Sequence, residues 1–146
     1  MPRRLALTLA FCTALATPAG AVISKTDEVP LDLTDAKALI KAENYTAALA
    51  EFTAIARTVV HADVYNLIGF TLRKSGLPDA GMAYYLRALA LDPDHKGALE
   101  YQGELFLQRG QPERARENLD RLNRLCPAGC EEQEDLAAAI AAHLRR

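Results

Sequence analysis

Hydrophobic positions along the chain recur with the spacing of α-helices. In residues 63–74 the apolar side chains Tyr65, Ile68 and Leu72 fall three and four residues apart, which places them on one face of a helix. We expect further helices over residues 78–91, 96–108, 112–125 and 131–146, and a less regular pair between residues 31 and 60. No segment carries convincing strand alternation, so the pattern predicts an all-α protein.

Glycine and proline separate the predicted helices at regular intervals. Gly76 follows the helix that ends near Lys74, where glycine adopts the left-handed cap conformation without steric cost. Pro78 suits the first turn of the next helix, and Pro93 prevents that helix from continuing. Each unit is therefore predicted to be two helices joined by a short turn.

These units repeat at a regular period. A shift of 34 superposes Gly69 on Gly103, Gly76 on Gly110, and Pro93 on Pro127. A weaker copy lies upstream by nearly the same shift, with Ala36 and Leu39 on one helix and Ala48, Phe52 and Ile55 on the next. The repeats are expected at residues 31–60, 61–94 and 95–127, within a repeat region of 31–130, and residues 131–146 are expected to form a capping helix.

Two glycines interrupt the predicted helices where glycine costs about 1 kcal/mol relative to alanine. Gly69 and Gly103 occupy matching positions, and the small residues Gly81 and Ala115 occupy matching positions on the second helices. We expect this absence of side-chain bulk to let the second helix of each unit approach the first closely.

The order and spacing of these residues resemble the tetratricopeptide repeat (TPR) family. The clearest copy consists of Tyr65, Ile68, Gly69, Leu72, Gly81, Tyr85, Ala88 and Pro93, and the second of Leu99, Gly103, Phe106, Ala115, Leu119 and Pro127. The second copy departs from the pattern at Gln102 and Leu122. The resemblance implies a right-handed α-α superhelix that binds a protein or peptide partner.

The resemblance also implies that the first helix of each unit lines a binding groove. The groove residues would then be Lys37, Lys41, Asn66, Phe70, Arg73, Lys74, Glu104 and Gln108, with Asp63 and Glu100 also facing inward. Its lysines and arginine would suit an acidic segment or a terminal carboxylate. The alternative is that they are ordinary solvated side chains.

Residues 1–21 have the three parts of a secretory signal peptide. A basic start at Arg3 and Arg4 precedes an apolar run over residues 5–16 and an Ala-x-Ala ending at Ala21. Cleavage after Ala21 would leave residues 22–30 as a flexible leader and place the protein in the periplasm or outside the cell. It would change the formal net charge from −2 to −4, because two arginines and no acid leave. We therefore expect no nucleic-acid binding and no stable membrane insertion.

Cleavage would also remove Cys12 and leave only Cys126 and Cys130. Two cysteines this close in an oxidising compartment are expected to form a disulfide between the last repeat and the capping helix. A redox pair or a soft-metal site is the alternative, although the spacing differs from that of the thioredoxin motif and no further cysteine is available as a ligand.

No group of residues has the local context of an active site, and His61 and His95 are expected to be solvated turn residues. The sequence therefore predicts a non-catalytic adaptor or assembly factor with no cofactor and no metal. The alternative is a redox or metal-handling protein that uses Cys126 and Cys130.

Overall fold

A computed structural model describes residues 31–145, and the predicted signal peptide and leader lie outside these residues. The described part contains seven helices and no strand. They are α1 (Thr34–Lys41), α2 (Tyr45–Ile55), α3 (Ala62–Lys74), α4 (Pro78–Leu91), α5 (Lys96–Gln108), α6 (Pro112–Leu125) and α7 (Glu131–Leu144). All seven belong to one compact unit that begins at Asp32.

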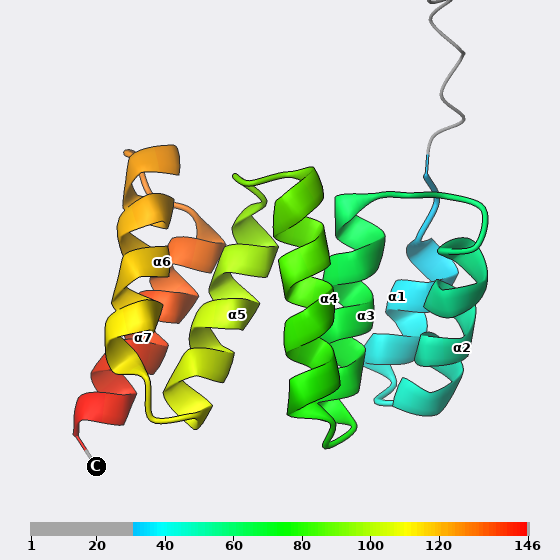
Figure 1. Cartoon of the computed structure of the whole chain (residues 1–146), viewed down its shortest axis with the longest axis horizontal. Helices are drawn as coiled ribbons and strands as arrows, with labels where there is room; N and C mark the ends of the chain where they lie inside the picture. The colour runs from blue at the N-terminus through cyan, green and yellow to red at the C-terminus, as the bar shows by residue number, and fades with distance from the viewer. Residues whose placement is uncertain (1–30, 146) are drawn as a thin grey trace, which may run out of the picture. The chain divides into compact units, whose positions relative to one another are not determined.

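The helices stand side by side in chain order, with α1 and α2 at one end and α6 and α7 at the other (Figure 1). They pair as α1–α2, α3–α4 and α5–α6, and α7 packs on both α5 and α6. In the same way, α5 packs on both α3 and α4. The prediction of an all-α solenoid is therefore confirmed, and α7 takes the place of the first helix of a further repeat.

The repeat period reappears in the helix boundaries. Helices α5 and α6 begin and end at the positions of α3 and α4 shifted by one full period, because the same residues stop and start each helix. Gly76 and Gly110 both adopt positive φ at the turns, and Pro78 and Pro112 both open the second helix. The first copy has Glu43 at the corresponding turn, where its φ of 55° also lies in the left-handed region.

The side chains of two turn histidines cap the first helices. His61 Nδ1 accepts a hydrogen bond from the Asp63 amide at 3.1 Å, and His95 Nδ1 accepts one from the Ala98 amide at 3.0 Å. Each satisfies a backbone donor that the first turn of a helix leaves without a partner.

Glycine allows α3 and α4 to approach closely, as the sequence predicts. A Cβ atom on Gly69 would lie 2.7 Å from the Tyr85 ring, and one on Gly81 would lie 2.8 Å from the Gly69 carbonyl oxygen. At Gly103 the nearest atoms belong to Leu136 of α7, so this glycine makes room for the helix that follows the repeat.

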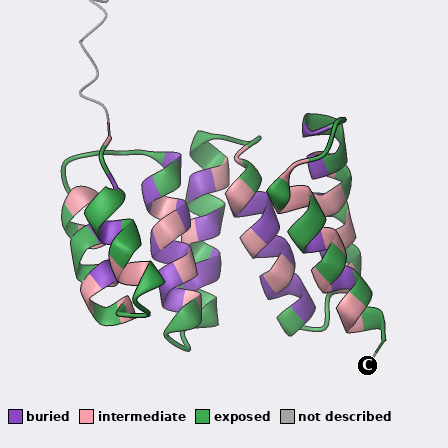
Figure 2. Cartoon of the chain, turned by 180° about the vertical axis from the view of Figure 1, so that it is seen from behind, coloured by how far each residue is buried: buried purple, intermediate pink, exposed green. Residues whose placement is uncertain are grey.

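The core runs along the array between the helix pairs. Figure 2 shows buried residues concentrated where α3, α4 and α5 face one another. The two departures from the repeat pattern are also buried. Asn118 donates hydrogen bonds to Gln102 Oε1 and the Leu99 carbonyl, and Leu122 packs in the cluster that contains Leu136 and Ile140.

Candidate functional site

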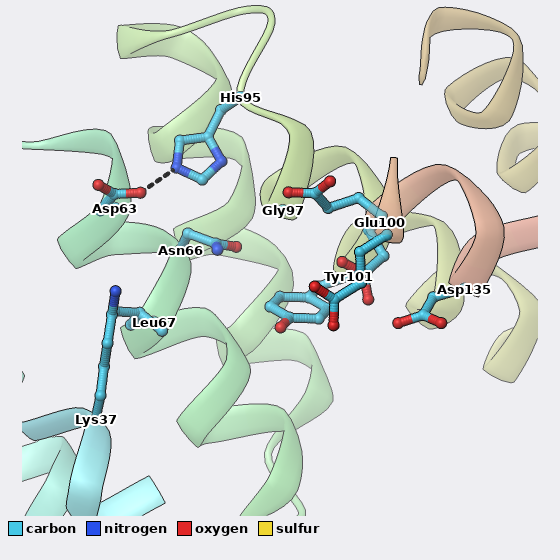
Figure 3. Close-up of a pocket in the computed structure, with 11 residues that line it drawn as sticks. Lys37, Asp63, Asn66, Leu67, His95, Gly97, Glu100, Tyr101 and Asp135 are labelled. Carbon is cyan, nitrogen blue, oxygen red and sulfur yellow. Dashed lines mark hydrogen bonds and ion pairs between the residues drawn. The ribbon is translucent and has the colours of Figure 1, made fainter. Parts of the chain in front are cut away.

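The first helix of each pair, together with α7, forms one side of the array, which we call the first-helix face: α1, α3, α5 and α7. Two hollows lie on this face. The first is a cavity of about 360 Å³ that we call the acidic pocket, and it is lined by Lys37, Asp63, Asn66, Leu67, His95, Gly97, Glu100, Tyr101, Glu131, Glu132 and Asp135 (Figure 3). All four first-face helices contribute to it.

Carboxylates dominate the acidic pocket. Among the described residues that line it, five are acids, supplied by α3, α5 and α7, and Lys37 of α1 is the only lysine or arginine. At one end His95 Nε2 lies 2.8 Å from Asp63 Oδ1, which joins the start of α5 to the start of α3 (Figure 3). The His95 ring therefore contacts backbone of its own helix through Nδ1 and a carboxylate of the preceding repeat through Nε2.

Glu100 is the most enclosed of these acids, with only 7% of its surface exposed. Burial, together with the nearby carboxylates of Glu104, Asp135, Glu132 and Glu131, raises the pKa of Glu100 to about 8. No ion pair or hydrogen bond to its carboxylate joins it to another residue between 31 and 145. The pocket thus holds a buried acid without a counterion.

Asn66 of α3 forms part of the wall opposite Glu100. It is 5% exposed, and its Oδ1 is buried with no hydrogen-bond partner in the described part of the chain. Its amide is directed toward the first turn of α5, where a Cβ on Gly97 would lie 3.0 Å from Asn66 Nδ2 (Figure 3). A buried amide oxygen without a partner costs about 1–3 kcal/mol, so a group that donates a hydrogen bond to it would be stabilising.

The second hollow is a cavity of about 370 Å³, one to two helix turns farther along α3, α5 and α7. It is lined by Arg73, Lys74, Glu104, Leu107, Gln108, Ala139, Ala142 and His143. Arg73 Nη2 lies 2.6 Å from Glu104 Oε2, and the guanidinium group also sits 5.7 Å from the Phe70 ring centroid and 5.8 Å from that of Tyr101. Here a cation is already paired with an acid against an aromatic wall.

Comparison with known families agrees with this architecture. A tetratricopeptide repeat family model matches residues 33–94 and 67–129, which together span most of the chain. The chain belongs to the tetratricopeptide repeat family. No curated protein matches this TPR chain in sequence.

The structure distributes the predicted groove residues over the two hollows of the TPR array. Lys37 and Asn66 line the acidic pocket, whereas Arg73, Lys74, Glu104 and Gln108 line the second hollow. Lys41 is exposed and lines neither. Phe70 also lines neither, and its ring packs 4.9 Å from the Tyr101 ring centroid.

The structure changes the expectation of a basic groove. The Arg73 side chain is only 8% exposed and its charge is compensated by Glu104, so it is not available as a free cation. Of the other predicted cations, Lys37 is outnumbered by the acids around it. Lys74 is exposed, and its Nζ lies 5.7 Å from the Phe70 ring centroid.

Sequence reasoning missed the contribution of α7 to this face. The sequence predicts only a capping helix over residues 131–146, yet Glu131, Glu132 and Asp135 of this helix form one wall of the acidic pocket. The signal that would have found them is the repeat period itself. Helix α7 begins one position beyond a full period after the start of α5, so it occupies a first-helix position of the next unit.

Cys126 and Cys130 lie together at the turn between α6 and α7. Their Sγ atoms are within bonding distance and their Cα atoms are 5.8 Å apart, in the range that disulfides span. Among residues 31–145, no group of three or more His, Cys, Asp or Glu side chains is arranged to hold a metal ion. None of the described helices is long and apolar enough to cross a membrane.

Proposed function

We propose that this TPR protein is a non-catalytic adaptor or assembly factor that binds a partner protein or peptide through its first-helix face. The observation that carries the proposal is the unsatisfied polar interior of the acidic pocket, where, among residues 31–145, Glu100 has no counterion and Asn66 Oδ1 has no hydrogen-bond partner. A donor group of a bound segment would satisfy the Asn66 oxygen, and a positive charge beside Glu100 would offset the burial and repulsion that raise its pKa.

The proposed location is the periplasm or the extracellular space. The basic start, apolar run and Ala-x-Ala ending of residues 1–21 support this location, since they match the parts of a secretory signal. We also propose that Cys126 and Cys130 form a disulfide that holds α7 against the last repeat. Their proximity supports this structural role, which preserves the wall of the acidic pocket that α7 supplies.

Photo-cross-linking tests the proposed binding face. A photoreactive amino acid is placed on the first-helix face at Lys37 or Lys74, and at the exposed positions Ala83 and Ala90 of α4 as matched controls. Each variant is expressed in the native host and irradiated in intact cells. We expect the same partner to be captured from Lys37 and Lys74 and not from α4. Capture from α4 alone, or none from either face, would contradict the proposal.

A further inference from the structure

We infer that the acidic pocket binds a lysine or arginine side chain carried by an extended segment of the partner protein. The inference rests on the proposed function and specifies its ligand. The inferred ligand is positively charged, whereas the basic groove predicted from the sequence would bind a negatively charged one.

The charge balance of the pocket favours a cationic ligand. Asp63, Glu100, Glu131, Glu132 and Asp135 surround a cavity to which α1 contributes only Lys37. Burial and the charges of the neighbouring carboxylates hold the pKa of Glu100 at about 8, and a cation bound among them would favour its ionised form. An acidic segment would instead add to the repulsion.

One turn farther along α5, a glutamate in a similar position already has a cationic partner from α3. Glu100 and Glu104 lie four residues apart, on one face of α5, with Tyr101 between them. Glu104 has a guanidinium partner, Arg73, which is held near the Phe70 and Tyr101 rings. At Glu100 the same face of α5 offers an acid beside Tyr101, but α3 provides Asn66 in place of an arginine.

The Asn66 side chain indicates which hydrogen-bonding group the ligand must carry. Its unpartnered Oδ1 is an acceptor, so its partner has to be a hydrogen-bond donor. Ammonium and guanidinium groups carry only donors and can satisfy an amide oxygen and a carboxylate together. A carboxylate or an aliphatic side chain has no donor and cannot satisfy either acceptor.

The shape of the site favours a protein segment over a free ion. The second hollow continues along the next turns of α3, α5 and α7, with Leu107, Ala139 and Ala142 on its walls. A segment that crosses the first-helix face would cover both hollows, placing a basic side chain at Glu100 and other residues against this less acidic surface.

A displayed library of random peptides tests the inference and does not require the partner to be identified first. It is selected on the full chain exported from its host, and in parallel on the pocket variant Glu100→Gln with Asp135→Asn. The control variant carries the same two kinds of substitution at exposed acids outside the pocket, Glu51→Gln with Asp120→Asn. Circular dichroism and thermal unfolding verify that all three proteins are folded.

We expect the unmodified protein to enrich lysine- or arginine-containing peptides and to deplete acidic ones. A selected peptide should lose affinity at least about tenfold with the pocket variant, and equally when its basic residue is replaced by a neutral isostere such as citrulline. The control variant should bind it normally. Enrichment without basic residues, no enrichment, or equal losses in both variants would overturn the inference. So would free arginine binding as tightly as the peptide.

These outcomes separate the inference from the proposed function. If photo-cross-linking captures a partner from Lys37 and Lys74 but selection yields no basic peptides, only the inferred ligand is wrong. If capture occurs only from α4, the proposed binding face itself is wrong.

Discussion

Arg73 of α3 and Glu104 of α5 form an ion pair across the boundary between the second and third repeats, with Nη2 and Oε2 2.6 Å apart. The arginine side chain is 8% exposed and the glutamate side chain 28%. The pair therefore contributes to the packing of one repeat on the next, and its arginine is part of the internal structure of the groove. A charge reversal at Arg73 would disturb this boundary as well as the surface charge, which makes Lys74 the better position for testing the predicted basic residues.

Removal of Glu104 should destabilise the array because it leaves Arg73 nearly buried without a counterion. We expect Glu104→Ala to lower the free energy of unfolding by about 2 kcal/mol, measured by urea denaturation. Glu113→Ala is the matched control, since Glu113 pairs with Arg116 on the exposed surface of α6. It should change the free energy by less than about 0.5 kcal/mol. Equal effects of the two substitutions would contradict the structural role assigned to the Arg73–Glu104 pair.

The turn between α1 and α2 should be improved by glycine. Glu43 has a φ of 55°, and a left-handed conformation costs a residue with a side chain roughly 1–2 kcal/mol. We expect Glu43→Gly to raise the free energy of unfolding by about 0.5–1 kcal/mol after the entropy of glycine is deducted. The same substitution at the exposed helical position Glu51 should lower it by about 1 kcal/mol. Destabilisation by both changes would argue against the turn geometry.

Stability should depend on pH through Glu100. Its pKa rises from an ordinary value of 4.5 to about 8 in the folded protein, so between these values the folded state binds more protons than the unfolded state. Ionisation of Glu100 therefore lowers the free energy of unfolding as pH rises from about 4.5 to about 8, and causes no further loss above pH 8.

Glu100→Gln should remove this dependence. Relative to the unmodified protein, we expect the variant to gain of the order of 2 kcal/mol of stability between about pH 5 and pH 9, measured by chemical denaturation at both values. Glu51→Gln, at an exposed site on α2, should leave the pH dependence unchanged. A variant that keeps the original slope would show that Glu100 is ionised at neutral pH in the folded protein.

Exported protein should contain no free thiols. We expect titration of the unreduced, denatured chain to detect none if residues 1–21 are removed and Cys126 pairs with Cys130. Closing a loop of this size is worth about 2 kcal/mol in the chain-entropy model, so Cys126→Ser with Cys130→Ser should destabilise the protein by roughly that amount. Two free thiols per chain would contradict the proposed disulfide.

The helices and their boundaries could be predicted from the sequence because their determinants are local. Gly76, Pro78, Gly110 and Pro112 fix the ends of four helices by backbone conformation alone, and all four ends match the prediction. The close approach of α4 to α3 at Gly69 could also be predicted. Glycine is unfavourable inside a helix, so its presence there indicates that a neighbouring helix occupies the space of the missing side chain.

The chemistry of the first-helix face could not be predicted in the same way. Whether Arg73 is a free cation depends on Glu104, which lies on a helix of the next repeat, and sequence spacing does not determine that contact. The acidic character of the pocket depends on α7, whose acids also suit a helix N-terminus. The same acids could either stabilise the helix N-terminus or line a pocket, and only the packing of α7 on α5 shows that they line the pocket.

Backbone amide chemical shifts, recorded by nuclear magnetic resonance during titration with a selected basic peptide, test the central claim most directly. We predict that the largest changes occur at Asn66, Gly97, Glu100 and Tyr101, which line the acidic pocket, and that the exposed side of α4 is unaffected. Changes centred on α4, or spread evenly over the surface, would contradict binding at the first-helix face.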